Sequence, residues 1–219
     1  MRLVSVNAGT PREVRWRGRR MRSAIWKTPL AGPARVHRLH LEGDEQADPA
    51  LHGGHEKAIY VYPAEHYAYW RPRLGELPWG AFGENFTTEG LLEAAVHIGD
   101  RLQIGDVLLE VTQPRTPCAT FARRIDEPRW VKRFTAANRT GAYLRVVEPG
   151  WIGAGDTVDV VVRPEHGVTV ADWFGAWNGG AETRGTAADL ARRLHAAEDD
   201  GQLRLSDDMR RRTKRAVAR

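Results

Sequence analysis

The sequence predicts a mainly β domain at residues 1–163 followed by a three-helix C-terminal extension at residues 164–219. Three observations lead to this prediction. Short apolar runs separated by turn residues fill the first three quarters of the chain, which is typical of a strand-rich domain. Gly-Asp pairs mark tight turns between several of these runs. After Pro164 the pattern changes to helix-capping residues, each followed by helix-forming residues.

The apolar runs are the expected strands, because short runs bounded by turn signals are typical of strands. In the turns, Gly accepts positive φ and Asp hydrogen-bonds its own backbone. The segment Ile98–Asp106 has such a Gly-Asp pair near each end, which predicts a hairpin corner in a curved sheet. The expected strands are Leu3–Val6, Val36–Leu41, Ala58–Tyr62, Val107–Val111, Tyr143–Val147 and Val158–Val162.

Two helices are expected to interrupt the strands. Proline favours the first turn of a helix because its fixed φ suits that position and its missing N–H has no partner there in any case. A helix is therefore predicted at Ala64–Leu74, after Pro63, and another near Pro128–Ala137.

Three capping signals follow in the extension. Ser and Thr side chains accept hydrogen bonds from the first free N–H groups of a helix, and acidic residues in the first turn support them. Leu190, Leu194 and Ala197 share one face of the second expected helix, so that helix is expected to pack on its neighbours or on the strand-rich domain. The expected caps are Thr169 with Asp172, Thr186 with Asp189, and Ser206 before Asp207 and Asp208.

Composition predicts a soluble protein of a reducing compartment. The 219 residues contain a single cysteine and no Cys-x-x-Cys pair, which excludes internal disulfides, zinc ribbons and thioredoxin-like motifs. Residues 1–22 contain arginines but no continuous apolar stretch, and no segment has the length and hydropathy of a signal peptide or a membrane span. The expected location is the cytoplasm, without a membrane partner.

Charge is distributed unevenly along the chain. The formal net charge is +5, but residues 1–40 carry +9 (ten basic, one acidic), residues 184–219 carry +4 (ten basic, six acidic) and the middle carries −8. Basic ends around an acidic centre can bind a polyanion. No aromatic-basic interleaving of a nucleic-acid module accompanies them, so a solvated surface is favoured and nucleic-acid binding is a minor alternative.

The single cysteine, Cys118, ends the segment Gln113–Cys118, which follows an apolar run. Pro114 and Pro117 fix their own φ angles and restrict the residues before them, so a stiff loop presents the thiol at the end of a strand. Arg115 can stabilise a thiolate or bind an anion beside it. The alternative is a small buried hydrophobic side chain.

A second unusual segment contains His52, Gly53 and Gly54, followed by Lys57. The two glycines let the backbone approach a ligand closely and leave N–H groups unshielded, and the lysine adds a cation at the start of the next strand. The alternative is a long loop with a surface histidine.

A third segment, Phe82–Phe86, places Glu84 and Asn85 between two aromatic residues. Their hydrogen-bonding groups suit a lip that binds a heterocycle. The alternative is a structural role in which Asn85 satisfies a turn.

These residue types also restrict the kind of metal site. Zinc deaminases need a second cysteine in a P-C-x-x-C arrangement, and this chain has none. A single thiolate suits a metal whose other positions are filled by a cofactor, and a sulfur-binding metal fits better than magnesium or calcium.

The chain carries six short blocks of distinctive residues in a fixed order. They are Gly43-Asp44-x-Gln46-Ala47-Asp48, His52-Gly53-Gly54-x-x-Lys57-Ala58, Tyr62-Pro63-x-Glu65-His66-Tyr67, Phe82-Gly83-Glu84-Asn85, Ile98-Gly99-Asp100 and Pro114-Arg115-x-Pro117-Cys118. Together they resemble the MOSC domain, and more narrowly the bacterial MOSC proteins linked to hydroxylaminopurine resistance, which carry a three-helix C-terminal extension. The resemblance spans nearly the whole chain. Each block alone is a weak signal, whereas their joint occurrence is specific.

The resemblance implies a strand-rich, barrel-like fold that binds the molybdenum cofactor (molybdopterin), a pyranopterin dithiolene phosphate. Carried over by position, Cys118 would be the thiolate ligand of molybdenum. Lys27 would meet the cofactor phosphate, with Lys57 or Arg115 as alternatives. The expected catalytic residues are Cys118, His52 and Asn85, and the expected cofactor-binding residues are Lys27, His52, Gly53, Gly54, Lys57, Gly83, Glu84, Asn85, Arg115, Thr116 and Pro117.

The resulting hypothesis is a molybdenum-dependent reductase that converts N-hydroxylated bases such as hydroxylaminopurine to the amine and water. The chain has no G-x-G-x-x-G fingerprint of its own, so a separate flavoprotein reductase is expected to supply electrons. One alternative is a non-catalytic carrier of the cofactor or of persulfide sulfur on Cys118. Another is a nucleic-acid-binding module built on the basic tail. The oligomeric state is left open, with a homodimer among the options.

Overall fold

A large mixed sheet forms the centre of the fold. The structure, a computed structural model, describes residues 1–16, 18–46 and 53–218. The strands of this sheet are β1 (Arg2–Ala8), β4 (Thr28–Pro29), β6 (Ile59–Pro63), β7 (Phe86–Glu89), β8 (Arg101–Ile104), β9 (Val107–Pro114), β10 (Ala142–Glu148) and β12 (Val158–Val162). Their order is β12-β8-β9-β10-β6-β7-β1-β4, and only β6 and β7 are paired in parallel. Two small antiparallel pairs lie outside this sheet, β2 (Arg12–Trp16) with β3 (Arg19–Ser23), and β5 (Ala34–Val36) with β11 (Gly150–Ile152).

The sheet curves so that β1, the first strand in the sequence, approaches the start of β12, the last strand in the sequence. A single isolated bridge joins Arg2 to Thr157, and the N–H of Leu3 donates to the carbonyl of Asp156 at 2.8 Å. No continuous ladder closes a barrel among the described strands. Helices contribute 31% and strands 28% of the residues, so the predicted mainly β class holds for the central sheet but not for the whole chain.

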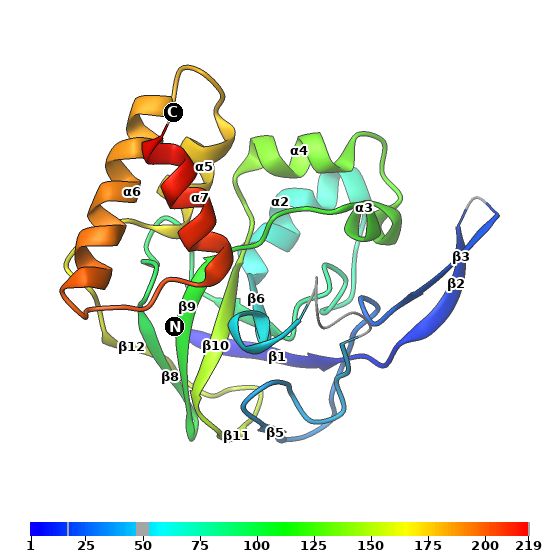
Figure 1. Ribbon diagram of the computed structural model, residues 1–219. Coiled ribbons are helices and arrows are strands. Elements are labelled where there is room, and N and C mark those ends of the chain that lie inside the picture. Colours follow the sequence, from blue (N-terminus) through cyan, green and yellow to red (C-terminus); the bar gives the residue numbers. More distant parts are fainter. Residues whose placement is uncertain (17, 47–52, 219) are drawn as a thin grey trace.

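Two groups of helices pack beside the sheet (Figure 1). One group follows the middle of the chain and the other forms the C-terminal extension. None of the described helices is both long and apolar enough to cross a membrane. The first group is α2 (Ala64–Leu74), α3 (Ala119–Ile125) and α4 (Trp130–Ala137), with a short 3-10 turn η1 (His55–Lys57) before β6, and the second is α5 (Val170–Asn178), α6 (Arg184–Asp199) and α7 (Asp207–Val217).

The C-terminal helices share a hydrophobic core with the sheet. Leu109 of β9 and Leu144 of β10 belong to the same buried cluster as Trp173 of α5, Leu194 of α6 and Met209 of α7. Burial of this apolar surface is the main force that holds the extension in place. The three predicted helices are thus confirmed, while the division into two domains between residues 163 and 164 stays a prediction.

A second, aromatic cluster lies under α2, α3 and α4. Tyr62, Phe82 and Phe121 are fully buried in it, with the ring centroids of Tyr62 and Phe82 4.6 Å apart. Cys118 and Ile25 pack against this cluster from the side of the pocket described below. The aromatic cluster therefore forms a rigid floor beneath the segment that carries the cysteine.

Several elements lie where local sequence signals predicted them. Helix α2 spans Ala64–Leu74 as expected. The Thr169 and Ser206 hydroxyls accept the N–H of the third helical residue of α5 and α7, at 3.0 Å and 3.2 Å. The expected hairpin is the β8–β9 pair, which turns at Gly105 and Asp106. These signals succeed because each depends on residues close together in the chain.

The expected strand at Val36–Leu41 is wrong. Strand β5 ends at Val36, and the N–H of His37 donates to the carbonyl of His40 at 2.8 Å, which reverses the chain. A run of apolar residues does not reveal such a reversal, because the turn is formed by the polar residues inside the run. The β2–β3 hairpin was not among the predicted strands, since arginine is not enriched in strands.

The predicted cap of the second C-terminal helix is also wrong. The first hydrogen bond of α6 runs from the N–H of Ala187 to the carbonyl of Thr183 at 2.9 Å, so the helix begins at Arg184 and Thr186 lies inside it. Thr183 does not cap α6 with its side chain; its hydroxyl donates to the carbonyl of Ala176 in α5 at 2.8 Å.

Candidate functional site

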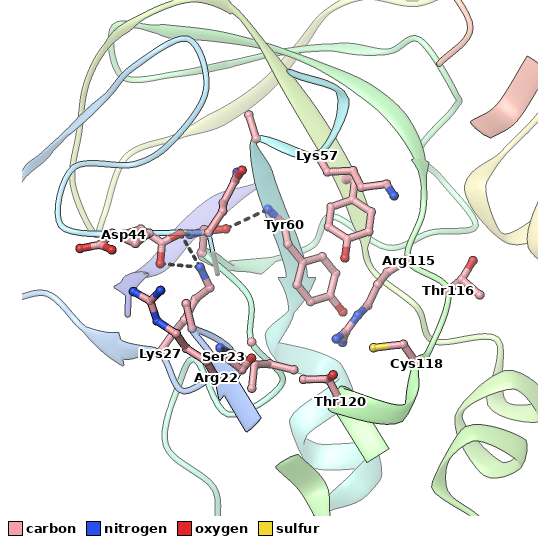
Figure 2. A pocket seen from close by; sticks show the side chains of 18 residues that line it. Arg22, Ser23, Lys27, Asp44, Lys57, Tyr60, Arg115, Thr116, Cys118 and Thr120 are labelled. Atoms are coloured by element: carbon pink, nitrogen blue, oxygen red, sulfur yellow. Dashed lines mark hydrogen bonds and ion pairs between the residues drawn. The ribbon is translucent and has the colours of Figure 1, made fainter. Parts of the chain in front are cut away.

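A pocket of about 200 Å³ opens where β6 and β10 meet the segment after β9 and the segment after β3 (Figure 2). A pocket of this size suits a small ligand or one end of a larger one. It is lined by Arg22, Ser23, Ala24, Ile25, Lys27, Asp44, Glu45, Gln46, Lys57, Ala58, Tyr60, Gly83, Asn85, Arg115, Thr116, Cys118, Thr120 and Tyr143.

Cys118 lies at one wall of this pocket. Strand β9 ends at Pro114, residues 115–118 are neither helix nor strand, and Cys118 is the extended residue immediately before α3. The thiol is half-buried, and its sulfur points towards the guanidinium of Arg115 (Figure 2). Thr116 also lines the pocket, whereas Pro117 is not among the lining residues. The predicted presentation of the cysteine by a loop at a strand end is confirmed.

Arg115 is a buried cation beside the thiol. Its side chain donates to the carbonyl of Phe82 at 3.0 Å, and its guanidinium carbon lies 3.6 Å from the ring centroid of Phe121 and 4.8 Å from that of Tyr60. Burial lowers the pKa of Arg115, but the phenols of Tyr60 and Tyr143 and the Cys118 thiol outweigh it and raise the pKa above its ordinary value. No described carboxylate forms an ion pair with this guanidinium, so it favours an anion in the pocket.

Two tyrosines form the wall between Cys118 and Lys57. Tyr60 of β6 and Tyr143 of β10 are register partners, and their ring centroids lie 5.4 Å apart. Burial raises the pKa of both phenols above the ordinary value of 10.0, so both remain protonated at neutral pH. The Tyr60 hydroxyl donates to the carbonyl of Thr140 at 2.8 Å. The ammonium of Lys57 lies 5.9 Å from the ring centroid of Tyr143.

Lys27 also lines the pocket, but it is held by a carboxylate. Its ammonium nitrogen lies 2.5 Å from both oxygens of Asp44, and both side chains are almost fully buried. Asp44 also accepts the N–H of Gly9 at 2.8 Å and the amide of Asn85 at 2.9 Å. Burial lowers the pKa of Lys27 below its ordinary value, and Asp44 partly offsets this effect. The expected contact of Lys27 with a cofactor phosphate stays a prediction.

The segment around Glu84 supports the pocket from behind. Glu84 is fully buried and does not line the cavity. Its carboxylate accepts the N–H groups of Gly80 and Phe82, at 2.8 Å and 3.1 Å, and the hydroxyl of Thr87 at 2.9 Å, and it is also bonded to Tyr67. The structure therefore places Glu84 in a supporting network rather than at the pocket surface, where the sequence had suggested a ligand contact.

Gly83 and Asn85, on either side of Glu84, do line the pocket. A Cβ at Gly83, whose φ is +81°, would meet Ile25 Cγ1 at 2.7 Å, so glycine is required there. The Asn85 side-chain oxygen accepts the N–H of Tyr60 at 3.1 Å, and its amide holds Asp44. Asn85 thus joins β6 to the Asp44–Lys27 pair.

The two glycines before η1 contact Gln46 rather than the pocket. The N–H of Gly54 donates to Gln46 Oε1 at 3.0 Å, and a Cβ at Gly53 would meet the same oxygen at 1.9 Å. The predicted approach of this backbone to a ligand stays a prediction, and the neighbour that the structure shows is the Gln46 side chain. His52, predicted as a pocket and catalytic residue, lies outside the described residues.

Sequence reasoning assigned no role to several pocket residues. Asp44 belongs to one of the six blocks that resemble the MOSC domain. Its ion pair with Lys27 joins positions 17 residues apart, so no short sequence pattern predicts it. Tyr60 and Tyr143 are brought together by the pairing of β6 with β10, and Arg22 reaches the pocket through the β2–β3 hairpin. Only the tertiary arrangement brings these side chains to one cavity.

The side chains that line the pocket suit an anionic cofactor whose own atoms supply most of the ligands of its metal. The described part of the chain contains no cluster of three His, Cys, Asp or Glu side chains that could hold a metal ion. The pocket instead combines one thiol, Cys118, with four cationic side chains, those of Arg22, Lys27, Lys57 and Arg115, against the two carboxylates of Asp44 and Glu45. A thiolate is a suitable ligand for a sulfur-binding metal, and guanidinium groups suit phosphate.

The fold and the pocket define a class of protein: a mixed sheet with a cationic cavity that exposes one thiol at a strand end. The chain belongs to the MOSC domain family, whose family model matches residues 48–159. The predicted family membership is confirmed.

Three relatives with 37–39% sequence identity support this assignment. The chain is 37% identical to the uncharacterized protein YflK of Bacillus subtilis over 169 residues, which are 77% of this chain and 76% of that protein. It is 38% identical to the protein YiiM of Escherichia coli over 147 residues, 64% of this chain and 65% of that protein. It is 39% identical to a protein named "Reductase" of Gibberella moniliformis over 154 residues, 67% of this chain but 27% of that protein.

Solved structures of YiiM proteins resemble the whole fold. The crystal structure of YiiM from Geobacillus stearothermophilus has a TM-score of 0.73 and 30% sequence identity, with 99% of this chain and 98% of that chain covered. The crystal structure of YiiM from Escherichia coli has a TM-score of 0.74 and 28% identity, with 100% and 94% covered. The likeness therefore includes the C-terminal helices.

Proposed function

We propose that the protein is a molybdenum-cofactor-dependent reductase of N-hydroxylated compounds, such as the base hydroxylaminopurine. The observation that carries this proposal is the position of one pocket thiol, Cys118, beside the buried guanidinium of Arg115. MOSC domains are generally associated with molybdenum cofactor binding. The fungal relative named "Reductase" supports the reaction class. We place the reaction in the cytoplasm.

The proposed reaction consumes two electrons and two protons: R–NHOH + 2 H⁺ + 2 e⁻ → R–NH₂ + H₂O. The N–O bond breaks, one N–H bond forms, and the hydroxyl oxygen leaves as water. When bound, the molybdenum cofactor supplies a two-electron redox centre with Lewis-acid character. The electrons come from a separate flavoprotein reductase.

The residues of the chain bind and orient the reactants. Cys118 supplies a thiolate ligand, which the positive charge of Arg115 stabilises. Lys57 and Arg22 line the pocket and offer positive charge to the cofactor phosphate, whereas the ammonium of Lys27 is held by Asp44.

The phenols of the pocket donate hydrogen bonds. Tyr143 keeps its proton at neutral pH because burial raises its pKa, so its hydroxyl is a donor to an oxygen or nitrogen of a bound ligand. Its register partner Tyr60 is engaged with the carbonyl of Thr140 and holds the wall in place. Asn85 keeps Asp44 and Lys27 in position through its side-chain amide.

Molybdenum content tests the proposal. The protein is purified from cells supplied with molybdate and able to make the cofactor, and molybdenum per chain is measured for the wild type, Cys118→Ser and the matched pocket variant Thr120→Ser. We expect near-stoichiometric metal in the wild type and in Thr120→Ser, and a large loss in Cys118→Ser. No molybdenum and no pterin fluorescence in any of the three proteins would refute a Cys118-bound cofactor.

Turnover separates the enzyme from the carrier alternative. Loaded wild-type protein is given hydroxylaminopurine and reduced methyl viologen, and formation of the amine is followed by chromatography. Turnover that depends on Cys118 supports the reductase. A fully loaded protein that forms no amine would instead be a non-catalytic carrier of the cofactor.

A further inference from the structure

The β2–β3 hairpin projects from the body of the protein and carries most of the positive charge of residues 1–40 (Figure 1). Its strands pair antiparallel, with Arg15 opposite Arg20 and Glu13 opposite Arg22. Among its described side chains, four arginines and one glutamate are exposed, a net charge of +3. The arginines are Arg12, Arg15, Arg20 and Arg22.

This hairpin has little internal neutralisation. Its one described ion pair joins Arg20 to Glu13 at 3.9 Å, with both side chains 70% exposed, and such pairs contribute little. Like charges on opposite strands repel each other, and the chain keeps them there although this disfavours the hairpin. Positive charge that a small exposed element retains in this way is available to an external anionic partner.

The basic C-terminal tail differs in this respect. Arg210 is paired with Glu198 at 2.6 Å, and Arg211 and Arg212 are paired with Asp208 at 3.2 Å and 2.9 Å. Acidic residues of α6 and α7 therefore neutralise much of the arginine charge of the tail. Of the two basic ends of the chain, the hairpin therefore has the weaker described neutralisation, since its one described ion pair is 3.9 Å long and exposed.

The hairpin also leads directly into the candidate active site. Strand β3 ends at Ser23, and Arg22, Ser23 and Ile25 line the pocket that contains Cys118. The base of the hairpin therefore lies at the rim of this pocket, while its far end projects away from the body of the protein (Figure 1). The reaction proposed above needs electrons delivered to that pocket from another protein.

We propose that the β2–β3 hairpin is the docking surface for the electron donor, an electron-transfer protein with an acidic surface around its flavin. This inference rests on the proposed function. A small, highly charged patch with few apolar side chains fits a transient redox encounter, since such complexes bury little surface and depend on electrostatic attraction for their rate. An acidic patch on the donor complements the arginines.

Charge reversal tests the docking surface. The variant Arg15→Glu/Arg20→Glu changes the net charge by −4 on the hairpin without altering a pocket-lining residue. Its matched control, Lys214→Glu/Arg215→Glu, makes the same change on exposed positions of α7. Reduction of hydroxylaminopurine is measured with a reduced flavodoxin as the protein donor and, separately, with methyl viologen as a small donor.

At low salt, we expect the KM for flavodoxin to rise about tenfold or more in the hairpin variant, because steering by complementary charge changes association rates by this order. The control variant and all viologen-driven rates stay within about twofold of the wild type. An equal effect in the two charge-reversed variants, or none in the hairpin variant, would overturn the proposal.

Direct binding distinguishes this inference from the proposed function. Affinity for flavodoxin is measured by biolayer interferometry, with a single-stranded oligonucleotide as a second probe. If wild type fails to reduce hydroxylaminopurine with viologen, the proposed function fails, while loss of flavodoxin binding in the hairpin variant alone still supports the docking surface. Loss of oligonucleotide binding with unchanged flavodoxin binding would instead assign the hairpin to nucleic acid and overturn the proposal.

Discussion

Replacement of Asp44 by asparagine tests the network that positions the pocket. The Asp44 carboxylate is buried and accepts hydrogen bonds from Lys27, the N–H of Gly9 and the amide of Asn85. Asparagine has nearly the same shape, so the change removes the negative charge without leaving a cavity. The ammonium of Lys27 is then buried without its counter-charge.

The expected loss of stability has two limits. Breaking a buried ion pair by removal of one partner typically costs about 3–5 kcal/mol. Lys27 can instead release its proton in the folded protein. The ordinary pKa of Lys27 is 10.5, which is 3.5 pH units above pH 7. At about 1.36 kcal/mol per unit, release of the proton at pH 7 costs roughly 5 kcal/mol. We therefore expect Asp44→Asn to lower the free energy of unfolding by about 3–5 kcal/mol at pH 7.

The pH dependence of this loss has a definite sign. Burial lowers the pKa of Lys27 in the folded protein, and loss of Asp44 removes what offset that shift. At pH values between the lowered pKa of Lys27 in the folded protein and its ordinary pKa of 10.5, the unfolded chain binds a proton that the folded protein lacks. The free energy of unfolding therefore rises with pH in this range. The variant should regain stability from pH 7 to pH 9, by at most about 1.36 kcal/mol per pH unit.

Urea unfolding followed by tryptophan fluorescence measures these effects. The control is Glu89→Gln, which removes an exposed carboxylate paired with Arg2 and should change stability by less than about 0.5 kcal/mol. The double variant Lys27→Met/Asp44→Asn removes both charges and should recover most of the loss. A loss below about 1 kcal/mol, or stability that falls from pH 7 to pH 9, would refute the reasoning.

Three further predictions follow from the structure. Ser206→Ala should lower the free energy of unfolding by about 1–2 kcal/mol, because the Ser206 hydroxyl caps α7 and donates to Gln113 at 2.7 Å. The control is Thr186→Ala, inside α6, which should change the free energy of unfolding by less than about 0.5 kcal/mol in the same urea assay. Gly141→Ala should be far more destabilising than Gly180→Ala in thermal unfolding. Both glycines have positive φ, but only at Gly141 would a Cβ meet a carbonyl oxygen, at 2.2 Å. Equal losses of thermal stability in the two variants would contradict this reasoning. Arg115→Lys should bind the cofactor roughly tenfold more weakly, and so reduce molybdenum per chain at limiting cofactor. Lysine cannot stack on two rings while it donates to a carbonyl, as Arg115 does. Unchanged metal content would argue against an anion site at Arg115.

Local signals predicted the elements that depend on neighbouring residues. Helix α2 follows Pro63 and spans the expected residues, and the caps of α5 and α7 are the threonine and serine that the sequence indicates. Strand β12 spans Val158–Val162 as expected. A cap or a turn is formed within a few residues, so its side-chain chemistry is visible in the sequence.

The errors come from contacts that the sequence does not display. The start of α6 is set by the packing of Thr183 against α5, through its hydroxyl and the carbonyl of Ala176, and not by the better local cap signal at Thr186. Strand β5 pairs with three residues of β11 and ends at Val36, where the chain turns back between His37 and His40. For α6, a contact with another helix overrides the local preference.

The candidate site was predicted in part for the same reason. Cys118 and Arg115 lie in one short loop, so their proximity was visible in the sequence. The glycines before η1 were predicted to approach a ligand, which stays a prediction, and their contact with Gln46 was not predicted. Glu84 was recognised as unusual, yet its burial behind the pocket depends on its bonds to Tyr67 and Thr87.

The sequence by itself determined the family, through six short blocks in a fixed order, and also the caps of α5 and α7, the β8–β9 turn and the loop that presents the single thiol, because each block, cap, turn or loop is encoded by residues a few positions apart. Only the tertiary structure decided the environment of that thiol. Burial of Arg115 between two rings, the pairing of Lys27 with Asp44 and the approach of the basic hairpin to the pocket all join distant segments. The physical reason is that burial changes the energy of a charge, and burial belongs to the folded chain as a whole.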